Sequence, residues 1–121
     1  MPVRRPDDRL SSADRPEAPI LDVSYWSLNG TATITADGEL DLATAPLLRA
    51  RLDEAARDGR TVVADLRQVS FMDSTGLQVL MHAEDASRED GWSWTILASE
   101  AVMRVVELAA LEERLPVRRP D

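Results

Sequence analysis

The sequence contains no cysteine and no lysine, and each absence excludes a kind of chemistry. Without cysteine, the chain has neither a disulfide framework nor a thiolate metal site, and an intracellular location is favoured. All 14 basic residues are arginine. This excludes the lysine of a P-loop, of a Schiff base and of a phospho-receiver domain.

Long apolar runs are also absent. No segment approaches the roughly 20 apolar residues that span a bilayer, and residues 1–5 lead into prolines and charges rather than into an apolar signal core. The formal net charge of -8 argues against nucleic acid or anionic lipid as a partner, because both require a positive surface. We therefore expect a cytoplasmic protein that binds another protein, with no direct nucleic-acid or membrane partner.

The 121 residues, 44% of them hydrophobic, suffice for one core. Residues 1–19 carry four prolines among arginine, aspartate and serine, which predicts a flexible N-terminal tail. The domain is expected over residues 20–117, followed by a short C-terminal tail, 118–121. The hexapeptide Pro2–Asp7 recurs at Pro116–Asp121, and we attribute this repeat to arginine and proline bias.

The hydrophobic pattern predicts a β-hairpin followed by alternating helices and strands. Asn29-Gly30 is a strong hairpin turn, Asp37-Gly38 marks a break, and Thr44 is a plausible N-cap. The predicted strands cover residues 21–28, 31–36, 61–66 and 92–98, and the predicted helices cover 44–58, 74–91 and a segment from 99 onward. The expected fold class is α/β, a small mixed sheet of about four strands plus an N-terminal hairpin strand, with helices packed against it.

The segment from Asp65 to Leu80 carries the functional signal. It passes from a strand through a loop to the polar cluster Asp73-Ser74-Thr75-Gly76, which opens a helix. A hydroxyl at a helix N-terminus points outward, where unpaired backbone N–H groups and the positive end of the dipole can receive a phosphate. The same pattern is also an ordinary helix cap, so the residues alone leave a cap and a switch open.

The run Asp73-Ser74-Thr75-Gly76-Leu77 resembles the signature of anti-sigma factor antagonists, which are bacterial members of the sulfate transporter and anti-sigma factor antagonist (STAS) domain family. Gly38-Glu39-Leu40-Asp41 resembles the second marker of that family, and the resemblance covers residues 21–117. It implies a STAS-like fold and phosphorylation of Ser74, with Thr75 as the second candidate. The kinase would be the cognate anti-sigma factor.

The resemblance also implies a partner switch. The unmodified protein would bind the anti-sigma factor, which has serine kinase activity, and so release a sigma factor; phosphorylation would end binding, and a serine phosphatase would reset the switch. The phosphate would add about -1.5 to -2 charges beside acidic side chains, which a partner surface would have to desolvate or repel. The implied partner-binding residues are Glu39, Asp41, Asp73, Ser74, Thr75, Gly76 and Leu77.

Roles within this set differ. Gly76 is expected to let a partner or kinase backbone approach closely, and Leu77 to supply apolar contact. For Asp41, a turn or cap role stays as open as partner contact. Ala110 stands where many members of the family have glycine, so the local geometry there is expected to differ.

The other conspicuous residues favour plain structural roles. Phe71 is predicted to be a core anchor, the three tryptophans Trp26, Trp92 and Trp94 to be packing residues, and His82 to face solvent. No cofactor or metal site is expected, because His82 is the single histidine.

Two other functions are alternatives to the partner switch. A hydrolase triad of Ser74, His82 and an aspartate is disfavoured because the first two are about 12 Å apart on the predicted helix, so we expect no enzyme and no catalytic residue. The other rival is a STAS-type scaffold or accessory subunit of a sensor complex or transporter without phospho-switching. We expect a monomer or a weak dimer.

Overall fold

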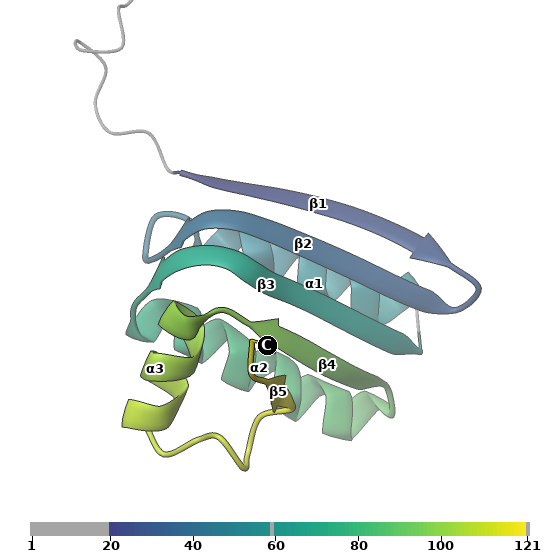
Figure 1. Ribbon diagram of the computed structural model, residues 1–121. Helices are drawn as coiled ribbons and strands as arrows, with labels where there is room; N and C mark the ends of the chain where they lie inside the picture. The colour runs from purple at the N-terminus through teal and green to yellow at the C-terminus, as the bar shows by residue number, and fades with distance from the viewer. Residues whose placement is uncertain (1–19, 59, 121) are drawn as a thin grey trace, which may run out of the picture.

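The computed structural model describes residues 20–58 and 60–120, so the predicted tail at residues 1–19 lies outside the described residues. The elements in chain order are β1 (Leu21–Leu28), β2 (Thr31–Leu40), α1 (Ala45–Asp58), β3 (Thr61–Met72), α2 (Ser74–Asp90), β4 (Ser93–Ala98), α3 (Glu100–Leu108) and β5 (Val117–Arg118). The strands form one sheet in the order β1-β2-β3-β4-β5 (Figure 1). The predicted α/β class, a small mixed sheet with helices packed against it, is confirmed.

The chain enters the sheet through the predicted hairpin. Strands β1 and β2 are antiparallel, with Leu28 opposite Thr31. Asn29 and Gly30 have φ of 51° and 82°, the left-handed conformation that matches a two-residue turn to the twist of the strands. The pairs from β2 to β5 are parallel, so the carboxyl ends of these strands lie at one edge of the sheet.

Strands β2 and β3 are longer than predicted, and the expected break at Asp37-Gly38 is wrong. The register shifts twice along β2, between Thr35 and Asp37 and between Gly38 and Glu39, but the strand continues to Leu40. Gly38 has φ 132°, and a Cβ there would lie 2.2 Å from the carbonyl oxygen of Ile20. Gly38 therefore permits the irregular register within β2 and the close approach of Ile20, the residue before β1.

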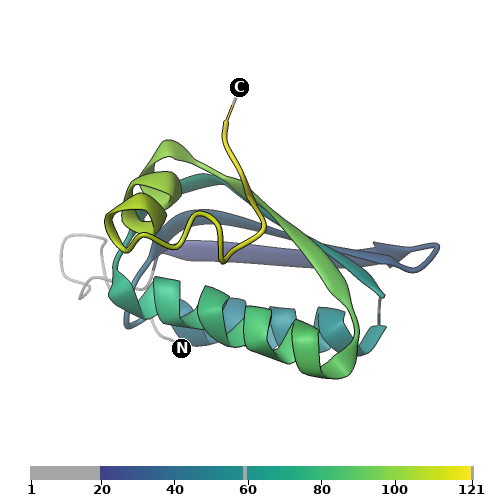
Figure 2. The same cartoon turned by 90° about the horizontal axis from the view of Figure 1, so that it is seen from below.

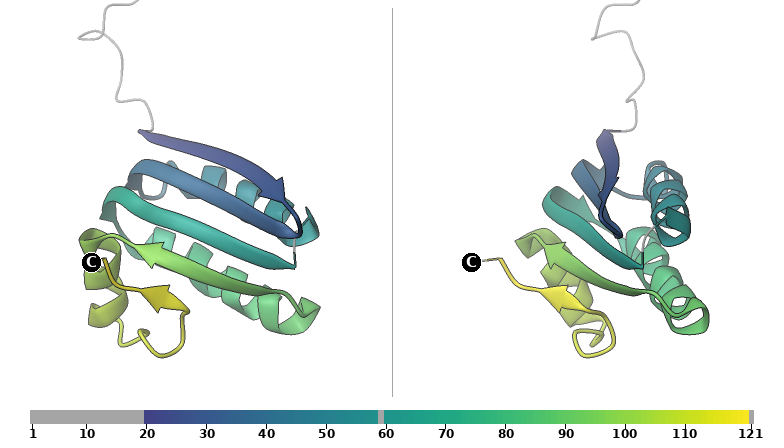
Figure 3. Two further views of the ribbon diagram at one scale, coloured as in Figure 1. Left: turned by 45° about the vertical axis from the view of Figure 1, so that its right-hand side comes forward. Right: turned by 90° about the vertical axis from the view of Figure 1, so that its right-hand side faces the viewer.

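The core lies between the sheet and the helices. Figures 2 and 3 show α1 and α2 side by side on one face of the sheet. Every second residue is buried in the first six residues of β2 and of β3 and throughout β4, and the residues between them are half-buried or exposed. The buried strand residues include Ala32, Ile34, Ala36, Val62, Ala64, Leu66, Trp94, Ile96 and Ala98.

Two of the three tryptophans are buried and one is exposed. Trp92 and Trp94 are buried, as predicted, with ring centroids 5.9 Å apart in an edge-to-face arrangement. The prediction that Trp26 is a packing residue is wrong, because its side chain is 53% exposed. Trp26 follows Tyr25 along β1 and so points to the opposite face of the sheet, where the helices α1 and α2 do not reach.

The sheet ends in a short strand. Strand β5 pairs with β4, with Leu97 opposite Arg118. Ala110, which follows α3, has φ 58°. This is the left-handed conformation that glycine adopts without strain, which explains why glycine suits that position.

Candidate functional site

The two motif segments meet at the carboxyl edge of the sheet. Strands β2 and β3 pair in parallel, with Glu39 opposite Phe71 and Leu40 opposite Met72. Just beyond the strands, the N–H of Asp73 donates a 3.2 Å hydrogen bond to the carbonyl oxygen of Leu40. The segments that the sequence assigned to one site are therefore adjacent, at the end of the sheet where α2 begins (Figure 1).

Asp73 is the N-cap of α2. Its backbone is extended, with φ -110° and ψ -171°, and its Oδ1 accepts hydrogen bonds from the N–H groups of Thr75 (2.9 Å) and Gly76 (3.3 Å). Ser74 is the first residue of the helix and is exposed. Within the described parts of the chain its hydroxyl has no hydrogen-bond partner. The cap is therefore built by the aspartate and leaves the serine hydroxyl available.

Gly76 has a different role from the one predicted. It is buried, and a Cβ at this position would lie 2.7 Å from Cγ of Met72 and 2.8 Å from Cγ of Leu40. The close approach made by this glycine is to the protein's own core, so the expected approach of a partner backbone is wrong for Gly76. Leu77 is half-buried and packs against the core, and Thr75 is also half-buried.

Asp41 forms the turn between β2 and α1. Its Oδ1 accepts hydrogen bonds from the N–H groups of Ala43 (3.0 Å) and Thr44 (3.1 Å), and its carbonyl oxygen accepts one from the N–H of Ala45 (2.8 Å). The turn role left open by the sequence is thus observed. Partner contact by Asp41 stays a prediction.

Thr44 contributes to the same turn. Its hydroxyl donates to the carbonyl oxygen of Glu39 (2.7 Å) and accepts from the N–H of Asp41 (2.9 Å). The hydroxyl of this buried threonine therefore links the turn to the end of β2. The predicted role of Thr44, capping of the first N–H groups of α1 by its side chain, is not observed. Asp41 already supplies the acceptor that the turn needs.

The edge is acidic and also exposes apolar side chains. Glu39 is exposed and Asp41 and Asp73 are half-buried, so three carboxylates lie in the segments around Ser74. Phe71 is 48% exposed, which overturns its prediction as a core anchor, because Met72 takes the buried position at the end of β3. Leu42, which the sequence analysis did not single out, is 75% exposed. Its signal in the sequence was a large apolar residue directly after Asp41, in the short segment between a strand and a helix.

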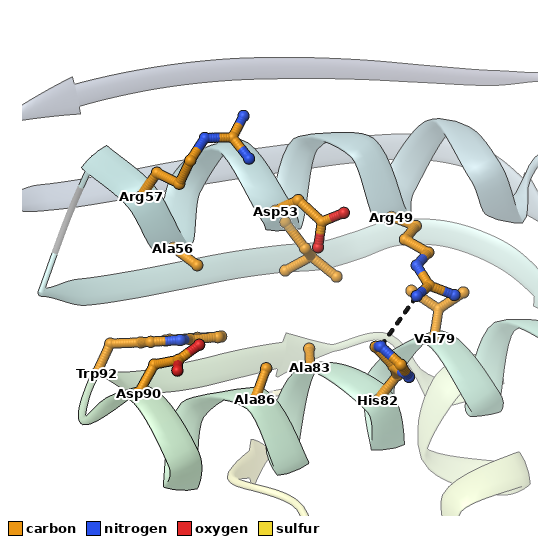
Figure 4. A pocket seen from close by; sticks show the side chains of 11 residues that line it. Arg49, Asp53, Ala56, Arg57, Val79, His82, Ala83, Ala86, Asp90 and Trp92 are labelled. Atoms are coloured by element: carbon orange, nitrogen blue, oxygen red, sulfur yellow. Dashed lines mark hydrogen bonds between the residues drawn. The ribbon is translucent and has the colours of Figure 1, made fainter.

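A groove between α1 and α2 starts beside the acidic edge. Its first part, about 320 Å³, is lined by Leu42, Ala45, Pro46, Arg49, Thr75, Gln78, Val79 and His82. A second part, about 240 Å³, shares Arg49, Val79 and His82 and reaches Trp92 (Figure 4). Nη2 of Arg49 donates a 2.9 Å hydrogen bond to Nε2 of His82 across the groove, because a guanidinium has no acceptor. His82 is exposed, as predicted.

A family model described as "Mlab, STAS domain" matches residues 27–117. The chain belongs to the STAS domain family. The anti-sigma-B factor antagonist of Bacillus subtilis is 32% identical over 81 residues, which cover 66% of this chain and 74% of that protein. The crystal structure of an anti-sigma factor antagonist from Mycobacterium paratuberculosis has a TM-score of 0.75 at 25% identity, and the match covers 88% of this chain and 92% of that one. The predicted resemblance to STAS anti-sigma factor antagonists is confirmed.

A further structural neighbour is the Bacillus protein SpoIIAA in its phosphorylated form. Its TM-score is 0.65 at 19% identity, over 83% of this chain and 92% of that one, which shows the shared fold.

The STAS domain brings all the predicted site residues to one edge of the sheet, but it divides their tasks. Asp73 and Asp41 stabilise the local backbone and Gly76 permits packing, whereas Ser74 and Glu39 are exposed. Within residues 20–58 and 60–120, no group of three or more histidine, aspartate or glutamate side chains could hold a metal ion. Over the same residues, no helix of the domain is long and apolar enough to cross a membrane.

Proposed function

We propose that this STAS domain is an anti-sigma factor antagonist that binds an anti-sigma factor in its unphosphorylated form and thereby releases a sigma factor. Phosphorylation of Ser74 by the serine kinase activity of that anti-sigma factor ends the binding, and a serine phosphatase restores it. The chain is the substrate of these cytoplasmic enzymes and has no catalytic activity of its own.

One observation carries the proposal. Ser74 is the exposed first residue of α2, and its hydroxyl is not used by the fold because Asp73 provides the cap. A kinase can therefore modify the hydroxyl without removing a stabilising contact. Thr75 is half-buried, so it stays the second candidate.

Electrostatics explains why modification would act on the partner rather than on the fold. A phosphate on Ser74 carries about -1.5 to -2 charges, which the N-terminus of α2 tolerates because its dipole favours negative charge. In an interface with a partner, the same phosphate adds negative charge to that of the carboxylates of Glu39, Asp41 and Asp73, and so weakens binding. A loss of about 1.4 kcal/mol there weakens binding tenfold. The phosphorylated structure of SpoIIAA supports the view that this fold accommodates the modification.

Affinity capture with paired baits tests the proposal. Ser74→Ala and Ser74→Asp proteins are immobilised and exposed to cytosol of the source organism, and bound proteins are identified by mass spectrometry. The matched control is Ser93→Ala, because Ser93 is an exposed serine at the start of β4 and is not part of the site. We expect Ser74→Ala and Ser93→Ala to retain an ATP-binding serine kinase of the anti-sigma type that Ser74→Asp loses. Retention of the same membrane or scaffold proteins by all three baits would contradict the switch and favour an accessory subunit.

A further inference from the structure

Three exposed apolar side chains belong to segments that adjoin the proposed site. Leu42, Leu47 and Phe71 are 75%, 46% and 48% exposed, and they lie in the turn before α1, in the first turn of α1 and at the end of β3. Hydrogen bonds of Asp41 and Thr44 hold the turn together, and Leu42 is too exposed to contribute much to its packing. Exposed apolar groups rimmed by polar ones typically mark an interaction surface.

Leu42 borders the first part of the groove between α1 and α2. Ala45, Pro46 and Val79 add apolar surface to this part, and Gln78 adds a polar side chain. Thr75, which directly follows Ser74, lines the same space. Its volume is about 320 Å³, and the hydrogen-bonded pair of Arg49 and His82 belongs both to its lining and to that of the part that reaches Trp92. We call this first part the anchor groove.

We propose that the anchor groove receives an apolar side chain of the anti-sigma factor, and that Leu42 is the principal contact. This inference rests on the proposed function and adds the part of the interface that the phosphorylation motif does not contain. Two of the lining residues are close in sequence to carboxylates, since Asp41 precedes Leu42 and Asp73 lies two residues before Thr75. The guanidinium of Arg49 in the lining is already bonded to His82. The partner segment therefore carries basic residues beside its apolar side chain. A second copy of this chain is disfavoured as the occupant, since two acidic edges of a protein with net charge -8 would meet.

The anchor and the switch are separate contributions to binding. Leu42 is not part of the cap of α2, and phosphorylation of Ser74 leaves its apolar surface unchanged. Burial of an exposed leucine in an interface contributes to the affinity of both the phosphorylated and the unphosphorylated forms, whereas the phosphate contributes only to the difference between them. Loss of the anchor should therefore weaken both forms by a similar factor.

The test uses four proteins in a two-by-two design: Ser74→Ala and Ser74→Asp, each with Leu42 or with Leu42→Ser. The probe is the purified anti-sigma kinase retained by the Ser74→Ala bait, and dissociation constants are measured by calorimetry or biolayer interferometry. We expect Leu42→Ser to weaken binding about tenfold or more in both backgrounds, and the ratio between Ser74→Ala and Ser74→Asp to stay within about twofold.

Leu108→Ser is the matched control, because Leu108 is 82% exposed at the end of α3 and does not line the groove. It should leave the affinity unchanged, and thermal unfolding should show all variants equally folded. Equal affinities of Leu42→Ser and Leu108→Ser, with the effect of Ser74 intact, would overturn the anchor and leave the proposed function standing. Failure of every form to bind such a kinase would overturn both. Light scattering measures self-association. If Leu42→Ser changes self-association but not the affinity for the kinase, the groove belongs to a contact with a second copy of the chain and the anchor is overturned.

Discussion

The N–H of Asp73 donates a hydrogen bond of 3.2 Å to the carbonyl oxygen of Leu40, and this contact joins the ends of β2 and β3. It places the start of α2 beside the turn that leads into α1. In this arrangement Asp73 and Asp41 stabilise the backbone, and the hydroxyl of Ser74 has no hydrogen-bond partner among the described residues. A chemical change at the hydroxyl should therefore be read by a partner and not by the fold.

Replacement of the cap should separate the roles of Asp73 and Ser74. Asp73→Ala removes the acceptor for the N–H groups of Thr75 and Gly76, and we expect the free energy of unfolding to fall by about 1–2 kcal/mol. Ser74→Ala removes no contact, so the expected change is within about 0.5 kcal/mol. Urea denaturation followed by circular dichroism measures both, with Asp73→Asn as the capping control. Equal losses in Asp73→Ala and Ser74→Ala would show that the hydroxyl stabilises the helix.

Gly76 should be intolerant of even one methyl group. Gly76→Ala places a Cβ 2.7 to 2.8 Å from side-chain atoms of Met72 and Leu40, and Leu40 is fully buried. We expect destabilisation by about 1–3 kcal/mol in urea denaturation, although alanine has the higher helix propensity. A stabilised Gly76→Ala protein would mean that the start of α2 is not packed against the strand ends.

Ala110, which follows α3 in the left-handed conformation, should be stabilised by the reverse change, from alanine to glycine. Ala110 has φ 58°, a conformation that costs an L-residue about 1–2 kcal/mol and costs glycine little. Ala110→Gly should therefore raise the free energy of unfolding by about 1 kcal/mol and raise Tm. Ala109→Gly is the matched control, because Ala109 has φ -88° and gains no relief of strain. Similar destabilisation by both changes would contradict the assigned conformation.

The sequence predicted most of the fold because its signals are local. Three local signals specify element boundaries through backbone geometry: the Asn29-Gly30 turn, the polar cluster that begins α2 with the cap Asp73, and Gly91, which ends α2. Residues whose environment depends on distant segments were misjudged. Phe71 and Trp26 are large and apolar, but strand alternation directs them away from the helices, and no local pattern reveals which face is covered.

The same distinction holds for the site. The paired motifs identified Ser74, Asp73 and Asp41, whereas the anchor groove exists only because α1 and α2 pack together. Gly76 was misread for a related reason: a glycine in a motif signals a close approach, but the approaching group is found only in the structure.

The single tyrosine provides a test of how the end of α1 is held against β1. The hydroxyl of Tyr25 donates a 2.5 Å hydrogen bond to Oδ2 of Asp58, and this bond, with smaller contributions from burial and from the carboxylate charge, raises the pKa of Tyr25 above its ordinary value. Because the pKa is raised in the folded state, the stabilisation is fully present below the unfolded pKa of about 10 and is lost as the pH rises through the folded pKa.

Absorbance titration of tyrosinate measures the pKa of Tyr25 directly, because the sequence contains no other tyrosine. We expect the transition to lie above the ordinary pKa of about 10 in the unmodified chain and to move down in Asp58→Asn, which lacks the charged acceptor. An identical midpoint in the two proteins would show that Asp58 does not hold Tyr25.

The central claim is that phosphate on Ser74 changes binding and not folding. The most direct measurement compares the purified chain, unmodified and stoichiometrically phosphorylated at Ser74, in its dissociation constant for the anti-sigma factor and in its urea midpoint. We expect the phosphorylated form to bind at least about tenfold more weakly, with an unchanged urea midpoint. Equal affinity of the two forms, or a loss of binding that tracks unfolding, would contradict it.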